Sequence, residues 1–176
     1  MKVFFQYFKN KISLLFFVFL FSAVSGFAQL KYVSIGVNGL TCSACTRSVE
    51  MSIRKLDFVQ DVQMNLKNTD GKILFKTGKT VSFEKIAQAV IDAGFSVRYL
   101  KADVAFDSLT ITNGFCYSFE DCFCQFVGIT NQKLSGEITL TFLGKKYLPH
   151  KEYKKWENQL KPNCNSTNKQ VYYVTI

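Results

Sequence analysis

Hydrophobic and polar residues follow regular patterns between residues 31 and 100, and these patterns predict six elements of secondary structure. Four segments alternate or run apolar as strands do, and two carry apolar side chains at intervals of three and four, as one face of a helix does. The strand-like segments are residues 33–37, 62–66, 73–75 and 95–99, and the helix-like segments are residues 45–56 and 83–91. Their order, βαββαβ, predicts an α+β ferredoxin-like sandwich with both helices on one face of an antiparallel sheet.

Local signals support the predicted ends of these elements. Ser82 suits the N-cap of the second helix, and Glu84 lies in its first turn, where the helix dipole favours an acid. Gly94 is expected to end that helix. Asn68 to Gly71 form a hairpin turn, since Asp-Gly tolerates positive φ.

Residues 101–176 have a weaker pattern and many aromatic side chains. The predicted strands are residues 108–112, 125–129, 137–143 and 171–176, and a short helix is predicted at residues 150–160. The last strand is apolar on both faces, so we expect it to be buried. This half is predicted to be a smaller β-rich module packed beside the first, and its role is unknown.

The first 28 residues have the pattern of a secretory signal peptide. Lys2, Lys9 and Lys11 precede an apolar run at residues 12–24, and small residues allow cleavage after Ala28. An uncleaved anchor is the alternative, but the apolar run is short for a membrane span of about 20 residues. We therefore expect an exported protein, periplasmic or secreted, without a stable membrane span after signal cleavage.

The charge of the chain adds little to this picture. The net charge of +9 includes three lysines of the leader, so the remaining chain carries +6. Its Lys and Arg residues are scattered, which argues against a nucleic-acid partner and is compatible with docking onto an acidic protein. A carboxylate pair, a nucleophile elbow and a phosphate-binding loop are all absent from the sequence, so no enzymatic activity is expected from those motifs.

Six cysteines divide into two groups, and Cys42 and Cys45 form the only pair in the first half. Thiolates at this spacing converge on one soft ion, such as Cu(I), Hg(II) or Zn(II). The pair lies where a strand leads into a helix, and unpaired N–H groups at a helix start lower the pKa of a thiol. Arg47 adds a cation nearby. Because zinc sites prefer four ligands, a site with two sulfurs favours Cu(I).

Two other uses of this pair have to be weighed. A thiol–disulfide oxidoreductase of the thioredoxin type also begins a helix with Cys-x-x-Cys, but it carries a proline facing the disulfide, and here no proline precedes Pro149. A structural disulfide between Cys42 and Cys45 would restrain little chain. It can still form in an oxidising compartment, and it would then block metal binding.

Residues 37–50, with the sequence VNGLTCSACTRSVE, resemble the heavy-metal-associated domain, whose signature is G-M-T-C-x-x-C. The resemblance continues through residues 62–66 to residues 91–95 and covers about 70 residues. It implies a ferredoxin-like fold, Cys42 and Cys45 as metal ligands, and Phe95 as an aromatic residue packed near the site. Leu40 replaces the usual Met beneath the loop, a volume-conserving change. Asp57 and Phe58 stand where many members have Pro-Gly.

The resemblance further implies ion transfer by thiolate exchange with a partner. An exported member is similar both to periplasmic mercury-binding proteins and to copper carriers. The sequence therefore predicts a non-enzymatic carrier or sensor that passes Cu(I), or another thiophilic ion, to a membrane metal transporter or a metalloenzyme by transient docking. The alternative is a thiol–disulfide oxidoreductase that uses the same two cysteines.

The remaining cysteines, Cys116, Cys122, Cys124 and Cys164, all lie in the second half. An even number in an exported chain favours two disulfides. Cys122 and Cys124 would face one side of a strand, so each is expected to pair with a distant partner. A second metal site, with His150 as a further ligand, is the other hypothesis.

Overall fold

The computed structural model describes residues 30, 32–119, 122–165 and 169–176, and the predicted signal peptide lies outside them. The strands are β1 (Tyr32–Asn38), β2 (Val59–Asn65), β3 (Asp70–Phe75), β4 (Ser96–Ile111), β5 (Cys116–Phe119), β6 (Cys122–Phe126), β7 (Gln132–Leu143) and β8 (Gln170–Thr175). The helices are α2 (Ser43–Arg54), α3 (Phe83–Asp92), α4 (His150–Trp156) and the 3₁₀ turn η1 (Glu157–Gln159). Within this described part of the chain, no helix combines the length and the apolar character that a membrane crossing needs.

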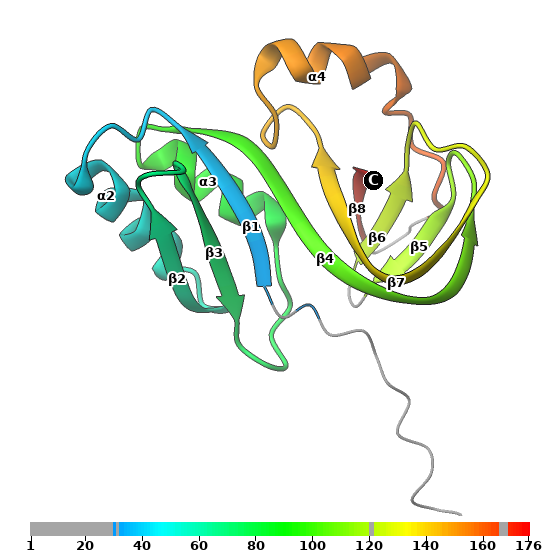
Figure 1. Ribbon diagram of the computed structural model, residues 1–176, viewed down its shortest axis with the longest axis horizontal. Coiled ribbons are helices and arrows are strands. Elements are labelled where there is room, and N and C mark those ends of the chain that lie inside the picture. Colours follow the sequence, from blue (N-terminus) through cyan, green and yellow to red (C-terminus); the bar gives the residue numbers. More distant parts are fainter. Residues whose placement is uncertain (1–29, 31, 120–121, 166–168) are drawn as a thin grey trace, which may run out of the picture.

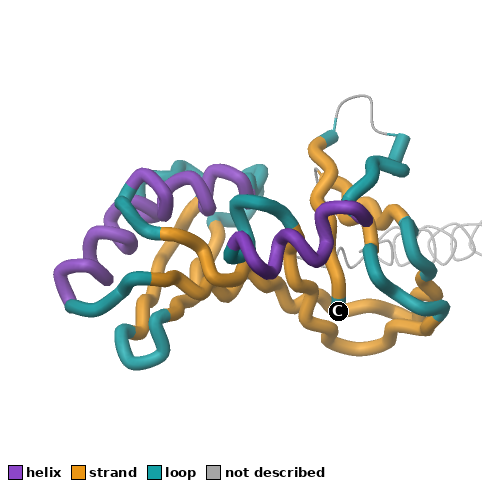
Figure 2. The backbone as a smooth tube through the Cα atoms, turned by 90° about the horizontal axis from the view of Figure 1, so that it is seen from above, coloured by secondary structure: helices purple, strands orange, loops and turns teal. Residues whose placement is uncertain are grey.

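The first half has the predicted ferredoxin-like architecture. Strands β2, β3, β1 and β4 lie side by side in that order, and every neighbouring pair is antiparallel. Helices α2 and α3 lie on one side of these strands (Figure 1 and Figure 2). The βαββαβ prediction is confirmed.

Both helices of this half begin at a side-chain cap. The Cys42 sulfur accepts a hydrogen bond from the backbone N–H of Cys45 at the start of α2, and the Ser82 hydroxyl accepts one from Lys85 at the start of α3. Such caps satisfy N–H groups that a helix leaves unpaired. Gly94 follows α3 with φ +89°, a conformation that glycine adopts without strain.

The two halves share one sheet because β4 is much longer than the pattern predicted. The predictions placed separate strands at residues 95–99 and 108–112, whereas β4 runs unbroken for 16 residues. It pairs with β1 near its start and with β7 over most of its length. The register shifts between Phe106 and Leu109, where Ser108 has a positive φ. The division at residues 100 and 101 therefore falls within a continuous strand.

The second half is β-rich, as predicted, and extends the same sheet in the order β4-β7-β8-β6-β5. Its element bounds differ from the predictions. β5 was not predicted, β6 begins at Cys122 instead of residue 125, and the helix predicted to reach residue 160 ends at Trp156. The last strand alternates between buried and half-buried positions, so it is covered fully on one face only.

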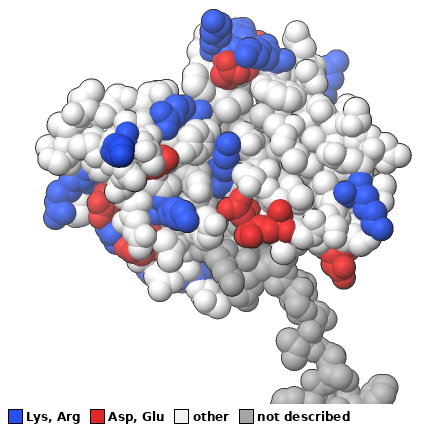
Figure 3. All heavy atoms as spheres, in the orientation of Figure 1, with Lys and Arg blue, Asp and Glu red and all other residues white. Residues whose placement is uncertain are grey.

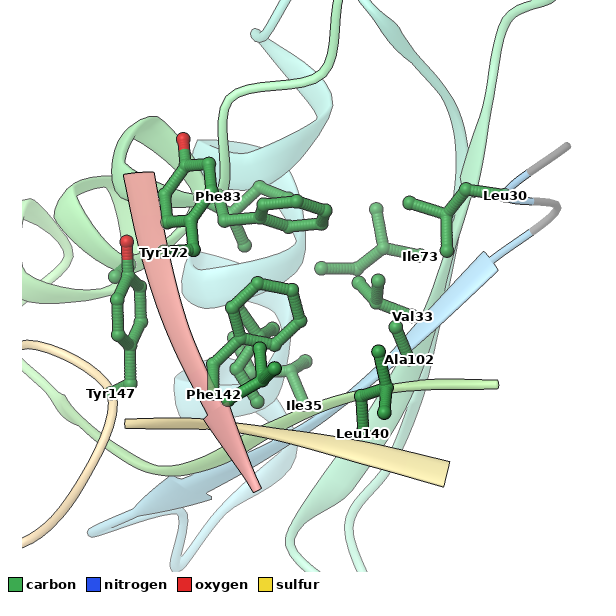
Figure 4. Close-up of a cluster of buried hydrophobic side chains, with 14 of the residues drawn as sticks. Leu30, Val33, Ile35, Ile73, Phe83, Ala102, Leu140, Phe142, Tyr147 and Tyr172 are labelled. Carbon is green, nitrogen blue, oxygen red and sulfur yellow. The ribbon is translucent and has the colours of Figure 1, made fainter. Parts of the chain in front are cut away.

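Aromatic side chains also connect the two halves, in addition to the continuous strand β4. Phe83, the first residue of α3, lies 4.3 Å from the ring of Phe142 on β7 and 5.0 Å from the ring of Tyr172 on β8, measured between centroids. Figure 4 shows these rings facing one another, with Tyr147 beside them. The start of α3 is thus packed into the core of the second half.

One disulfide, between Cys116 and Cys164, fastens the segment after η1 to β5. Gln125, buried on the neighbouring strand, donates a hydrogen bond to the carbonyl of Lys161 and accepts one from the backbone N–H of Asn163. Cys122 and Cys124 are free and buried. The expectation of two disulfides in this half is therefore wrong. The expectation that Cys122 and Cys124 share one side of a strand is consistent with their joint burial on β6.

Candidate metal centre

Cys42 and Cys45 lie on the loop that joins β1 to α2. β1 ends at Asn38, Gly39 turns the chain with φ +90°, and Cys42 immediately precedes the first residue of α2. The side chain of Cys42 is exposed and that of Cys45 is half-buried. The pair is therefore accessible to solvent, at the end of the sheet where the loop after β1 leads into α2.

The two sulfurs are adjacent and are bonded as a disulfide, with Cα atoms 5.2 Å apart. The Cys42 sulfur also accepts the hydrogen bond from the Cys45 backbone N–H, at 3.1 Å. The loop thus holds both sulfurs at one point, and the open end of the helix points an N–H group at one of them. Reduction of the disulfide yields a pair of thiols that can converge on one ion.

The electrostatic surroundings favour negative charge on these sulfurs. The first turn of α2 contains no acidic side chain, and the partial positive charge of a helix N-terminus stabilises an anion there. Arg47, the fifth residue of α2, is exposed. A thiolate pair, or its complex with a monovalent cation, would carry a net negative charge, which this end of the helix accommodates.

Two apolar side chains support the loop from inside. Leu40 is only 4% exposed, and it occupies the position below the loop that was expected to tolerate a change from Met. The half-buried ring of Phe95 lies against Gly39, where an added Cβ would sit 3.4 Å from the ring. The packing predicted for Phe95 is therefore present.

Thr46 is a residue of the site that the sequence analysis missed. It is buried, and its hydroxyl donates a hydrogen bond to the Cys42 carbonyl at 3.2 Å, beside the backbone bond from its own N–H to the same oxygen at 3.1 Å. The carbonyl oxygen of Cys42 thus accepts two hydrogen bonds from Thr46. A hydroxyl directly after the second cysteine was the available signal.

The cysteines of the second half form a different arrangement. A hydrogen bond to Cys122, together with burial, raises the pKa of the Cys124 thiol well above its ordinary value. His150 is exposed at the start of α4. Among the residues that the structure describes, no three His, Cys, Asp or Glu side chains come together as a metal site, so the hypothesis of a site completed by His150 gains no support.

The first half of the chain is similar in sequence to known proteins. The profile of the heavy-metal-associated domain matches residues 34–96. The mercuric transport protein periplasmic component of Pseudomonas fluorescens is 35% identical over 68 residues, which are 39% of this chain and 74% of that protein. Copper-transporting ATPase 1 of Rhizobium meliloti is 39% identical over 70 residues, which are 40% of this chain and only 8% of the ATPase.

Solved structures similar to this chain include the oxidized MerP of Ralstonia metallidurans, at 32% identity and a TM-score of 0.36, covering 39% of this chain and 94% of that one. A copper-binding domain from the P-type ATPase HMA7 has 29% identity and a TM-score of 0.36, covering 39% of this chain and 92% of that domain.

The matched residues, 34–96, contain the cysteine loop and both helices of the ferredoxin-like half. The similarity to the periplasmic mercuric transport protein spans most of that protein's length. Through these residues, the chain belongs to the heavy-metal-associated domain family.

Proposed function

We propose that this protein binds Cu(I) through Cys42 and Cys45 and passes it to a partner protein. The observation that carries the proposal is the placement of two adjacent sulfurs on an accessible loop at the N-terminus of a 12-residue helix. Soft sulfur ligands select thiophilic ions over hard cations. Membership of the heavy-metal-associated family, with copper-transporting and mercuric transport relatives, supports the same class of ion.

The preference for Cu(I) follows from coordination number and charge. Two thiolates satisfy a two-coordinate ion, whereas structural zinc sites take four ligands. A Cu(I) complex with two thiolates carries one negative charge, and the helix N-terminus stabilises that charge. Hg(II) has the same two-coordinate geometry and is the principal alternative cargo, and Zn(II) would require ligands from a partner.

Loading requires the Cys42–Cys45 disulfide to be reduced first. A dithiol reductant supplies two electrons and two protons, opens the S–S bond and is itself oxidised to a disulfide. Binding of Cu(I) then displaces the thiol protons to solvent. Because only two protein sulfurs hold the ion, an incoming thiolate of a partner can attack it and take it over by ligand exchange.

The partner expected from this chemistry is a membrane metal transporter or a metalloenzyme that offers its own thiolates during transient docking. Basic side chains gather over α4 (Figure 3), where Lys154 and Lys155 are ion-paired with Glu157 and Glu152. The net positive charge of the chain favours a partner with an acidic docking face. The signal peptide predicted for residues 1–28 and the similarity to a periplasmic protein support action outside the cytoplasm.

The second candidate function is thiol–disulfide exchange without a metal, and the disulfide between Cys42 and Cys45 is the observation that favours it. We prefer the carrier, since the relatives include a copper-transporting ATPase and a mercuric transport protein, and since the sequence has no proline before Pro149 to face the pair as in thioredoxin-type enzymes.

The test is metal analysis of the purified, reduced protein after incubation with Cu(I) without oxygen. Wild type should retain about one more ion per chain than the Cys42→Ser/Cys45→Ser variant. Equal metal in both proteins would overturn the proposal. Reduction of insulin by the metal-free protein, lost in the same variant, would favour the oxidoreductase instead.

A further inference from the structure

Cys122 and Cys124 remain free thiols in a structure whose other four cysteines are joined in disulfides. They are two residues apart on β6, which pairs with β5 on one side and with β8 on the other. Both side chains are buried, with exposures of 7% and 2%. The strand pairing fixes their backbone, so their separation is set by the fold.

That separation is too large for a disulfide and suits a metal bridge. Residues two apart on a strand have Cα atoms about 6.6 Å apart. Their side chains stand roughly parallel on the same face, so their Cβ atoms are about as far apart. An S–S bond needs Cβ atoms only about 4 Å apart. Two metal–sulfur bonds of about 2.3 Å each would join sulfurs roughly 4.6 Å apart. A hydrogen bond to Cys122, with burial, raises the pKa of the Cys124 thiol, and both side chains are buried on β6.

The thiols have few other partners that would hold them in place. Cys122 donates a hydrogen bond to the Phe119 carbonyl at 3.2 Å, across the β5–β6 pair. Tyr172 is the register neighbour of Cys124 on β8. Burial raises the pKa of both Tyr172 and Tyr147, and the nearby Cys122 adds to both shifts. The rings of Tyr147 and Tyr172 contact each other, so both tyrosines lie in the part of the core that adjoins Cys124.

The charge of the surroundings selects the ion. Burial, followed by the nearby Tyr172, Glu84 and Cys122, raises the pKa of Tyr147, and the adjacent Lys146 is ion-paired with Glu84 at the surface. A Cu(I) dithiolate would place an uncompensated negative charge in this core, which is costly. A divalent ion that accepts two-coordinate sulfur forms a neutral complex with two thiolates, so burial does not oppose it.

We propose that Cys122 and Cys124 form a second, buried site for a two-coordinate divalent thiophilic ion, of which Hg(II) is the simplest example. Binding forms two metal–sulfur bonds, breaks two S–H bonds and releases two protons to solvent, with no change in oxidation state. The site is separate from the Cys42–Cys45 loop. The protein would therefore hold two thiol sites that differ in exposure and in the charge of the ion they favour.

The oxidised protein tests this directly, because in it Cys122 and Cys124 are the only free thiols. Titration with mercuric chloride, without reductant, should bind one ion per chain. Binding should release about two protons per ion and remove both thiols from detection after denaturation. X-ray absorption should find two sulfur neighbours around the metal. Because Cys42 and Cys45 are blocked by their disulfide, this result is independent of the proposed function.

Cys122→Ser and Cys124→Ser each leave one thiol and should abolish the two-sulfur complex, whereas Cys42→Ser/Cys45→Ser should retain it. Should the serine variants fail to fold, the proton release and sulfur count of wild type still decide. Two ions per chain with one sulfur neighbour each, or no bound ion with both thiols still detectable, would overturn the second site. Equal uptake of Cu(I) by the oxidised protein would overturn its selectivity for divalent ions.

Discussion

The sulfur of Cys42 accepts a hydrogen bond from the backbone N–H of Cys45, at 3.1 Å. The first sulfur of the pair therefore caps the helix that carries the second. A charged acceptor strengthens such a bond, so the same contact favours the thiolate over the thiol. Local helix geometry and affinity for a cation are thus two consequences of one arrangement.

Thr46→Val should weaken the loop. The hydroxyl of Thr46 donates to the Cys42 carbonyl, and its removal should lower the free energy of unfolding by about 1 kcal/mol, as measured in urea. Because the carbonyl belongs to a proposed ligand, Cu(I) affinity of the reduced protein should fall about tenfold. Thr46→Ser keeps the hydroxyl and serves as the control. A loss as large in Thr46→Ser would mean that the hydrogen bond is not responsible.

Leu40→Ala should destabilise the protein by about 2–5 kcal/mol, since Leu40 is buried beneath the loop and its truncation leaves a cavity. Leu40→Met conserves volume and should cost less than about 1.5 kcal/mol. Urea unfolding of the two variants gives both values. Similar losses for Met and Ala would show that this position does not tolerate the exchange that the sequence analysis assumed.

Much of the first half could be predicted from its sequence because its periodicities are local. The 3.6-residue pattern of α2 and α3, the Ser82 cap and the Gly94 stop are short-range signals, and the structure has elements at each of them. The cysteine loop was identified for the same reason. Its buried Thr46 was missed, because a hydroxyl beside the ligands does not reveal whether it faces the core.

The second half was harder to predict because its strands depend on distant partners. Ala102, Val104 and Phe106 alternate inward along β4, but the small Ala102 and the apolar Ala105 on the outward face weaken the pattern. β5 is four residues long and is defined by its pairing with β6. The choice of Cys164 as partner of Cys116 also depends on tertiary structure, since spacing alone leaves several pairings open.

Phe83 and Phe142 should be energetically coupled across the two halves. Their ring centroids are 4.3 Å apart, and such aromatic pairs contribute about 0.5–1.5 kcal/mol beyond burial. A double-mutant cycle with Phe83→Leu and Phe142→Leu, measured by urea unfolding, should give a coupling energy in that range. Strictly additive effects of the two substitutions would contradict the packing of α3 against β7.

Removal of the Cys116–Cys164 disulfide should destabilise the protein by about 2–4 kcal/mol, since it closes a loop with a sequence separation of 48. Cys116→Ser/Cys164→Ser, unfolded in urea without reductant, provides the value. Cys42→Ser/Cys45→Ser is the matched comparison, and its smaller separation of 3 should give a smaller loss. A larger loss for the Cys42→Ser/Cys45→Ser variant would contradict the expectation that the Cys116–Cys164 disulfide stabilises the fold more.

Competition for Cu(I) against a coloured chelator tests the central claim most directly. The reduced wild-type protein should withdraw about one Cu(I) per chain from the chelator complex. Cys116→Ser/Cys164→Ser should do the same, and Cys42→Ser should leave the complex intact. Should the Cys42→Ser protein withdraw as much Cu(I) as wild type, the ion is held elsewhere and the cysteine loop is not the metal site.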